Sequence, residues 1–278
     1  MILSFHPIYE GNKNIICAGR KPDACDLKEI RKAKAVILPQ GCSEELYRMA
    51  VEHCPHVFPN YHTRFLYPGK LNQASLFSFH KVPFPGTRTF SHLESFLKDN
   101  GESPGKLFDF PFVFKFDWGG EGDFVFLVRS QTDFAGVLHR AEKYEKTGQK
   151  GFLLQKFIPC GGRSLRVVVI HDQLISYWRT NQGNAFYGNL KSGGVIDSDS
   201  DPDLQETGKE AVKSFCAQTN INLAGLDLIF SQEEKYPTPF FIEINYFFGR
   251  RGLGGSESYY SLLIRGIESW IKTRGLNL

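Results

Sequence analysis

The sequence contains no C-x-x-C pair, no long basic run and no apolar stretch of membrane-spanning length. Its six cysteines are scattered, which argues against a zinc site and against a disulfide scaffold. Residues 1–7 carry neither a basic segment nor a long apolar run, so we expect no signal peptide, no membrane partner and a reduced, cytoplasmic setting. The formal charge of +3 is small and spread along the chain, so nucleic acid is not expected as a partner either.

Several signatures of catalytic and metal-binding proteins are also missing. There is no G-x-S-x-G nucleophile elbow and no H-E-x-x-H spacing among the histidines. Residues 197–203 carry aspartate at alternate positions, as a calcium loop does. Pro202 and Gly208, however, occupy the positions where such a loop needs glycine and a bidentate glutamate. We therefore reject an EF-hand and interpret this segment as a solvated loop before a helix.

Apolar and aromatic strand segments are abundant, and the chain holds 25 phenylalanines. The first 62 residues are interpreted as a short α/β domain, in which Ser43 is the expected N-cap of a helix. Beyond it we predict a mixed α/β (α+β) fold, with a helix at 92–99 capped by Ser91 and Glu94. Strands are predicted at 15–17, 35–38, from 57, and at 112–115, 124–128, 152–155, 165–170, 174–178, 224–230 and 240–245, and further helices within 64–76, at 133–147, after 203 and around 262–271.

The most informative stretch is the strand 240–245, in which Glu243 and Asn245 point to one face because side chains alternate along a strand. The preceding strand, 224–230, carries a single carboxylate, Asp227, among apolar residues. If the two carboxylates lie about 4 Å apart, their repulsion is roughly 4 kcal/mol at an effective dielectric of 20, so a cation or a shared proton is expected. This oxygen-rich set suits magnesium. The alternative is that each carboxylate caps a loop or pairs with an arginine.

Two further segments could contact a nucleotide. Lys115 ends an apolar strand and is followed by the glycine-rich loop 118–122, whose backbone N–H groups could face phosphate in a hairpin that closes like a flap. The alternative is a plain hairpin turn with a surface lysine. Residues 155–158 leave a buried strand, where backbone groups could meet an adenine edge.

Arg166 and Arg179 each lie in or at the end of a strand that is otherwise apolar. A guanidinium in such a place is expected to have an anionic partner. That partner can be a structural carboxylate or a phosphate, and the sequence does not decide between them.

Taken in order, these segments resemble the ATP-grasp superfamily of carboxylate–amine ligases, and most closely the glutamate ligases of the RimK kind. Lys70 followed by 82–87 is similar to the family's entry segment. Segment 189–194, N-L-K-S-G-G, is similar to its "N-L-x-x-G-G" segment. The resemblance covers roughly residues 64–272. It assigns nucleotide binding to Lys70, Lys115, Gly119, Gly120, Gly122, Gln155, Lys156, Phe157, Ile158, Arg166, Asn189 and Lys191, and metal binding to Asp227, Glu243 and Asn245.

The resemblance implies a fold of two α+β subdomains that clasp a nucleotide, preceded by a short α/β pre-ATP-grasp domain. The expected boundaries are 1–62 for the pre-ATP-grasp domain and 63–278 for the ATP-grasp domain. Within the latter, 63–155 includes the small flap-bearing subdomain and 156–278 forms the metal-binding subdomain.

The implied function is ATP-dependent ligation through an acyl phosphate, with ATP and Mg²⁺ (or Mn²⁺) as cofactors. Lys70, Lys115 and the flap would offset phosphate charge, and Arg179 would stabilise the developing oxyanion; Lys115 and Arg179 are the catalytic candidates. The expected partners are small-molecule or peptide carboxylates and amines, and a homo-oligomer is compatible with this interpretation. His6, Arg250 and Arg251 are substrate-contact candidates, although a solvated surface role fits the two arginines equally. The alternatives are an ATP-binding module without ligase activity and an ATP-dependent kinase of a small molecule.

Overall fold

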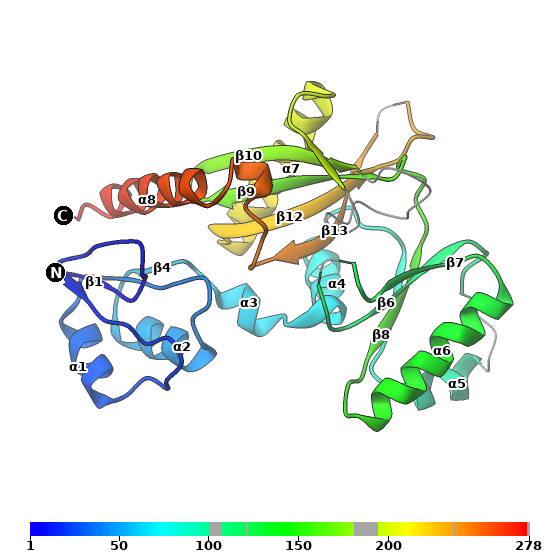
Figure 1. Cartoon of the computed structure of the whole chain (residues 1–278), viewed down its shortest axis with the longest axis horizontal. Coiled ribbons are helices and arrows are strands. Elements are labelled where there is room, and N and C mark those ends of the chain that lie inside the picture. The colour runs from blue at the N-terminus through cyan, green and yellow to red at the C-terminus, as the bar shows by residue number, and fades with distance from the viewer. Residues whose placement is uncertain (101–106, 121, 181–193, 236, 277–278) are drawn as a thin grey trace.

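The computed structural model describes residues 1–100, 107–120, 122–180, 194–235 and 237–276. Within this part of the chain the strands form three sheets, and each sheet is built from its own continuous stretch of the sequence (Figure 1). The large sheet runs along the top of Figure 1, with the N-terminal unit below it at the left and the small sheet below it at the right. None of the helices in the described ranges combines the length and the apolar character needed to cross a membrane.

The N-terminal sheet is parallel, with the strand order β2-β1-β3-β4. Its helix α2 begins after Ser43, whose Oγ accepts a hydrogen bond from the N–H of Leu46 at 3.2 Å, so the predicted N-cap is confirmed. The elements of this unit are β1 Ile2–Ser4, β2 Lys13–Asn14, α1 Ala24–Lys32, β3 Ala35–Ile37, α2 Glu44–His53 and β4 Val57–Phe58.

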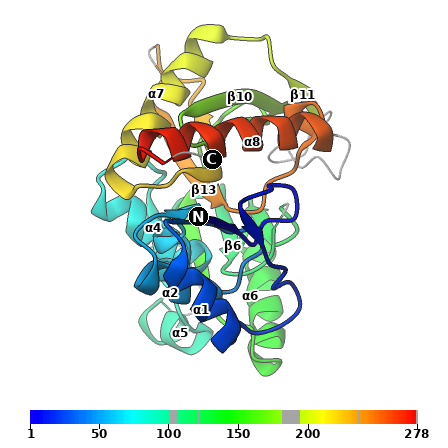
Figure 2. The same cartoon turned by 90° about the vertical axis from the view of Figure 1, so that its left-hand side faces the viewer.

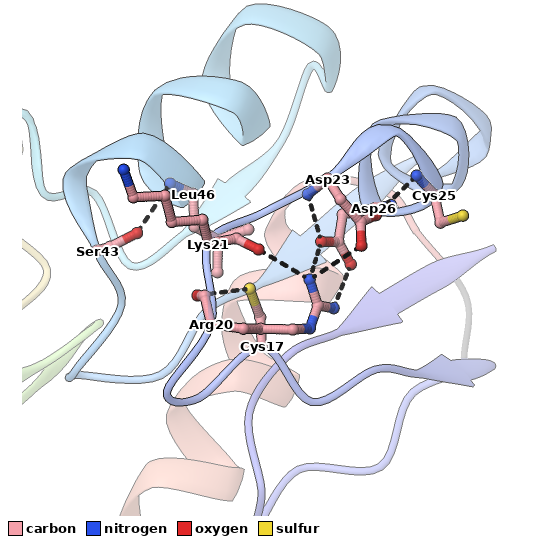
Figure 3. Close-up of polar contacts among 8 residues, drawn as sticks. All are labelled: Cys17, Arg20, Lys21, Asp23, Cys25, Asp26, Ser43 and Leu46. Atoms are coloured by element: carbon pink, nitrogen blue, oxygen red, sulfur yellow. Dashed lines mark hydrogen bonds and ion pairs between the residues drawn. The ribbon is translucent and has the colours of Figure 1, made fainter.

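The start of α1 is fixed by charged side chains, which Figure 3 shows. Asp23 and Asp26 form a capping box: the carboxylate of Asp23 accepts from the backbone N–H of Asp26, and the carboxylate of Asp26 accepts from the backbone N–H of Asp23. Arg20 donates to both oxygens of the buried Asp26, at 2.5 and 2.7 Å. The loop before α1 is therefore held in one conformation.

The small sheet is antiparallel, with the order β5-β8-β6-β7. Helices α5 and α6 pack against it, and phenylalanines supply most of the core between them: Phe96, Phe112, Phe114, Phe116, Phe134 and Phe152 are all buried. Much of the chain's phenylalanine is therefore core packing. The elements are β5 Thr87–Phe90, α5 Leu93–Asn100, β6 Phe112–Phe116, β7 Val125–Val128, α6 Gln131–Lys146 and β8 Phe152–Lys156.

The large sheet has the order β11-β10-β9-β12-β13, with every neighbouring pair antiparallel. Alternate residues of β9 enter different cores: Val167 and Val169 pack with Phe215 of α7, and Val168 and Ile170 with α8. The two helices therefore cover opposite faces (Figure 2). The elements are β9 Arg163–Ile170, β10 Gln173–Thr180, β11 Val195–Asp197, α7 Pro202–Thr219, β12 Leu223–Phe230, β13 Pro239–Asn245, η2 Arg251–Leu253 and α8 Ser256–Thr273.

Two helices, α3 His62–Leu66 and α4 Gly69–Phe79, lead from the N-terminal sheet to the other two sheets (Figure 1). The N-terminal unit also shares a core with the large sheet's helix, since the rings of Phe58 and Trp270 lie 5.5 Å apart. The proposed division into domains at residues 62 and 155 stays a prediction, although the ends of β4 and β8 lie close to both boundaries.

Two local predictions need correction, and three short strands were not predicted. Residues 15–17 are not a strand; β2 ends at Asn14, because its pairing with β1 is short and the chain then turns at 18–20. Helix α5 begins at Leu93, whose N–H is bound by Glu145 of α6 and not by Ser91. Strands β1, β5 and β11 were not predicted, since each is only three or four residues long.

Candidate functional site

Polar side chains gather on one face of the large sheet, across the middle of β9 and β12 and toward the end of β13. The register places Asp227 of β12 between Arg166 of β9 and Glu243 of β13. Asn245 lies opposite Gly225, two residues from Asp227 on the same face. The predicted adjacency of the two carboxylates is thus present, and both predicted arginines join them, since Arg179 of β10 reaches the same carboxylate.

Asp227 is 5% exposed and its two oxygens meet three partners. Arg166 donates to both oxygens, Arg179 Nη2 lies 2.8 Å from Oδ1, and Asn245 Nδ2 donates to Oδ2 at 3.0 Å. Burial alone would raise the pKa of this carboxyl, but the two guanidinium charges outweigh it and hold the pKa below its usual value. The anionic partner expected for both arginines is therefore Asp227.

Two lysines from different elements face Glu243. Lys70, near the start of α4, has its Nζ 3.9 Å from Glu243 Oε1. Lys115 of β6 is 4% exposed, and burial lowers its pKa to about 8. The charge of Lys70 also lowers this pKa, whereas the charge of Glu243 raises it. A buried ammonium whose proton is this weakly held favours an anionic ligand beside it.

The hairpin between β6 and β7 is the glycine-rich segment predicted as a flap. Gly119 and Gly122 both have positive φ, and a Cβ on Gly119 would overlap the ring of Phe124. Lys70 Nζ donates to the carbonyls of Trp118 and Gly119, at 3.2 and 2.8 Å. The structure therefore brings Lys70, Lys115 and the flap together above β13.

Two residues that the sequence analysis missed hold Lys70 in this place. Asp117 caps α4 by accepting from the N–H of Leu71 at 2.9 Å. Gln73, one turn beyond Lys70, exchanges two hydrogen bonds of 2.9 Å with the backbone N–H and C=O of Ile244. Ile244 stands between Glu243 and Asn245, so Gln73 ties α4 to the strand that carries the predicted metal ligands. A glutamine three residues after a lysine is too common a spacing to have indicated this contact.

The predicted adenine hinge continues from β8. Gln155 is 4% exposed and donates through Nε2 to Thr87 Oγ1 at 2.9 Å. Lys156 is exposed, Phe157 is half-buried and Ile158 packs beside Ile229. In this strand exit Lys156 N–H donates to the Gly86 carbonyl, which fixes the end of β8 against the start of β5.

The lysines fit the phosphates of ATP, and Glu243 and Asn245 supply oxygen atoms of the kind that Mg²⁺ binds. Asp227 is paired with arginine, as the alternative in the sequence analysis had it, so a metal there would share its oxygens with Arg166, Arg179 and Asn245. Among the described residues no group hydrogen-bonds to Gln155 Oε1 or to Arg179 Nε, although both atoms are buried. A ligand that donates to the first and accepts from the second would satisfy both. No group of three or more His, Cys, Asp and Glu side chains in the described ranges is arranged to hold a metal by itself, so any metal here needs Asn245 or a ligand oxygen.

The substrate candidates come from the turn after β1 and the loop after β13. Burial lowers the pKa of His6 to about 4, and the charge of Arg250 acts in the same direction. Arg250 donates to Tyr260 Oη at 2.6 Å and stacks on Tyr259, whereas Arg251 is exposed. Asn189 and Lys191 lie outside the described residues.

Comparison with known proteins agrees with this geometry. The family model for the RimK-like ATP-grasp domain matches residues 70–260. No curated protein matches the chain by sequence. Among solved structures, a RimK-domain ATP-grasp protein from Sphaerobacter thermophilus superposes with a TM-score of 0.63 at 16% identity, covering 95% of this chain and 98% of its own.

Two further structures are ligases by their descriptions. D-alanine–D-alanine ligase from Bacillus anthracis, complexed with ATP, has a TM-score of 0.64 at 14% identity, over 96% of this chain and 89% of that one. VanG D-Ala:D-Ser ligase from Enterococcus faecalis has a TM-score of 0.61 at 15% identity, over 84% and 68%. At these identities the structures establish the ATP-grasp fold, and the family match covers most of the chain. The chain therefore belongs to the RimK-like ATP-grasp domain family.

Proposed function

We propose that the protein uses Mg-ATP to join a carboxylate to an amine through an acyl phosphate. The observation that carries this proposal is the convergence of four cationic side chains, Lys70, Lys115, Arg166 and Arg179, on Asp227 and Glu243 between the small and large sheets. So much positive charge around two carboxylates suits a polyphosphate with its metal.

The residues take separate roles in this proposal. Asp227, Glu243 and Asn245 would hold Mg²⁺ or Mn²⁺, which supplies charge neutralisation on phosphate oxygens. Lys70, Lys115 and the backbone of the flap bind phosphate, while Gln155 and the strand exit after it bind adenine. Arg179 is placed to stabilise the oxyanion that develops on the reacting carboxyl group.

The reaction has two displacements. A carboxylate oxygen forms a bond to the γ-phosphorus as the bond from that phosphorus to the β–γ bridging oxygen breaks, and ADP leaves. The amine nitrogen then bonds to the acyl carbon, inorganic phosphate leaves, and the nitrogen gives up a proton.

The test is to trap the acyl phosphate. The protein is incubated with Mg-ATP, a panel of amino acids and short peptides as carboxylates, and hydroxylamine as a small amine. The proposal predicts ADP release together with a hydroxamate. ADP release with a phosphorylated alcohol and no hydroxamate would instead indicate a kinase, and binding of Mg-ATP with no ADP release would indicate a module without ligase activity.

A further inference from the structure

A hollow of about 460 Å³ lies in the N-terminal unit, away from the carboxylates of the large sheet. Its walls follow the carboxyl ends of three parallel strands: Phe5 and Pro7 after β1, residues 16–21 after β2, and residues 39–43 after β3. Strand β1 has β2 on one side and β3 on the other, so the chain reverses its direction of strand addition here. In open parallel sheets this crevice is the general place for a ligand.

The body of the hollow is apolar. Phe5, Cys17 and Leu46 are buried side chains of its floor. Ile16 lies at its rim with 73% of its surface exposed and adds an apolar side chain there. The hollow therefore suits a compact apolar group.

One wall is built to stay in place. The loop of residues 17–23 is held by Arg20, which donates to Asp26, and by the carbonyl of Arg20, which accepts from the thiol of Cys17 at 3.7 Å (Figure 3). Arg20 also donates to the carbonyl of Lys21 at 3.1 Å. A wall fixed before a ligand arrives loses little conformational entropy on binding.

The polar end of the hollow has one uncompensated charge. Figure 3 shows Lys21 extending from the loop toward Ser43 and the first turn of α2. No described carboxylate lies within ion-pair distance of Lys21. The nearby charges already have partners, since Arg20 forms an ion pair with Asp26 and Glu44 forms one with Arg48. The remaining acid of that turn, Glu45, is exposed and does not line the hollow. An ammonium beside a helix N-terminus favours a carboxylate.

The hollow is connected to the proposed catalytic centre through its second wall. Gln40 Nε2 donates to the carbonyl of Tyr246 at 3.2 Å, and a Cβ on Gly41 would lie 3.8 Å from the ring of Phe247. Tyr246 and Phe247 directly follow Asn245 in the chain. The loop that forms this wall is therefore joined to the segment that follows the predicted metal ligands.

We propose that this hollow binds a small molecule with a compact apolar body and a carboxylate. Lys21 and the start of α2 bind the carboxylate, and Phe5, Ile16 and Leu46 enclose the body. Binding in the hollow does not rest on the proposed function.

The test uses 4-fluorophenylacetate as the probe, followed by ¹⁹F NMR line broadening on the full-length protein, with 4-fluorophenylacetamide as its uncharged counterpart. We expect the acid to bind and the amide to bind about tenfold more weakly, the factor for one lost charge-assisted contact. Lys21→Met should weaken the acid by about the same factor and leave the amide unchanged. Ala18→Trp, which places a large side chain in the hollow from an exposed position, should abolish binding of both.

Lys28→Met is the matched control, because Lys28 is exposed on α1 and does not line the hollow. Equal binding of acid and amide, no binding of either at millimolar probe, or full binding to the Ala18→Trp variant would overturn the inference. The melting shift with Mg-ATP is measured on the same samples. A protein that responds to Mg-ATP but not to the probe contradicts only the hollow, whereas one that binds the probe but not Mg-ATP contradicts the proposed function.

Discussion

Arg166 on β9 and Asp227 on β12 face each other in the sheet, and the guanidinium donates to both oxygens of the carboxylate. Both side chains are buried, and Arg179 adds a second guanidinium to the same carboxylate. The pair therefore contributes both to the stability of the fold and to the site, because Asp227 neutralises the charge of two arginines before any phosphate is present.

Asp227→Asn should destabilise the free protein by about 3–5 kcal/mol, because it leaves two guanidinium groups without their counter-charge. Glu243→Gln is the matched comparison, since the side chain of Glu243 is 27% exposed and the Nζ of Lys70 lies 3.9 Å from its carboxylate; we expect a change within about 1 kcal/mol. Urea unfolding measures both. Equal losses of stability would contradict this account of Asp227.

Nucleotide affinity should fall as the pH rises through about 8, where Lys115 of the free protein loses its proton. The stability of the free protein should change in the opposite direction. Between pH 8 and the ordinary lysine pKa of 10.5, the unfolded chain binds this proton more tightly than the folded one, so unfolding free energy rises with pH.

Lys115→Met should therefore raise the melting temperature near neutral pH while removing Mg-ATP binding and its pH dependence. Lys150→Met, at an exposed position, is the control. A Lys115→Met protein that still binds Mg-ATP with wild-type affinity would remove this lysine from the site.

Gln73→Ala should weaken Mg-ATP binding several-fold at a cost in stability of about 1 kcal/mol, because it frees α4 from the backbone of Ile244. Asn72→Ala, on the exposed side of the same helix, should leave affinity unchanged. Isothermal titration with Mg-ATP separates the two variants. If both bind equally well, Lys70 does not depend on this tether.

Gly119→Ala and Gly120→Ala form a second matched pair in the flap. A Cβ at Gly119 meets the Phe124 ring and sits on a positive φ, whereas one at Gly120 meets nothing within 4 Å. We expect Gly119→Ala to lower Mg-ATP affinity and Gly120→Ala to preserve it. Indistinguishable affinities would show that the flap need not hold this conformation for nucleotide binding.

Strand alternation allowed much of the site to be predicted. Asp227, Glu243 and Asn245 are interruptions of apolar strands close together in the chain, and adjacent segments of this kind usually pair. That these residues converge with Lys115 was predicted from the order in which the family's motifs follow one another along the chain. The contact of Gln73 with Ile244 spans 171 positions and satisfies backbone groups on the outer edge of β13, which no local pattern reveals.

The errors have similar causes. The strand predicted at 15–17 is apolar, but pairing with the short β1 ends first, so tertiary hydrogen bonding prevailed over composition. The cap of α5 comes from Glu145 of another helix, and a capping-box spacing at Ser91 and Glu94 cannot show such a partner. The sequence predicted that Arg166 and Arg179 need an anion, and only the register shows that both share Asp227.

The central claim is that Mg-ATP binds between the small and large sheets, and thermal unfolding with and without Mg-ATP tests it most directly. At a Mg-ATP concentration 100 times the dissociation constant, binding should add about 2.7 kcal/mol to the unfolding free energy, and Glu243→Gln should lose the magnesium-dependent part of that gain. An unchanged melting curve at millimolar Mg-ATP, or a Glu243→Gln variant that responds as the wild type does, would contradict it.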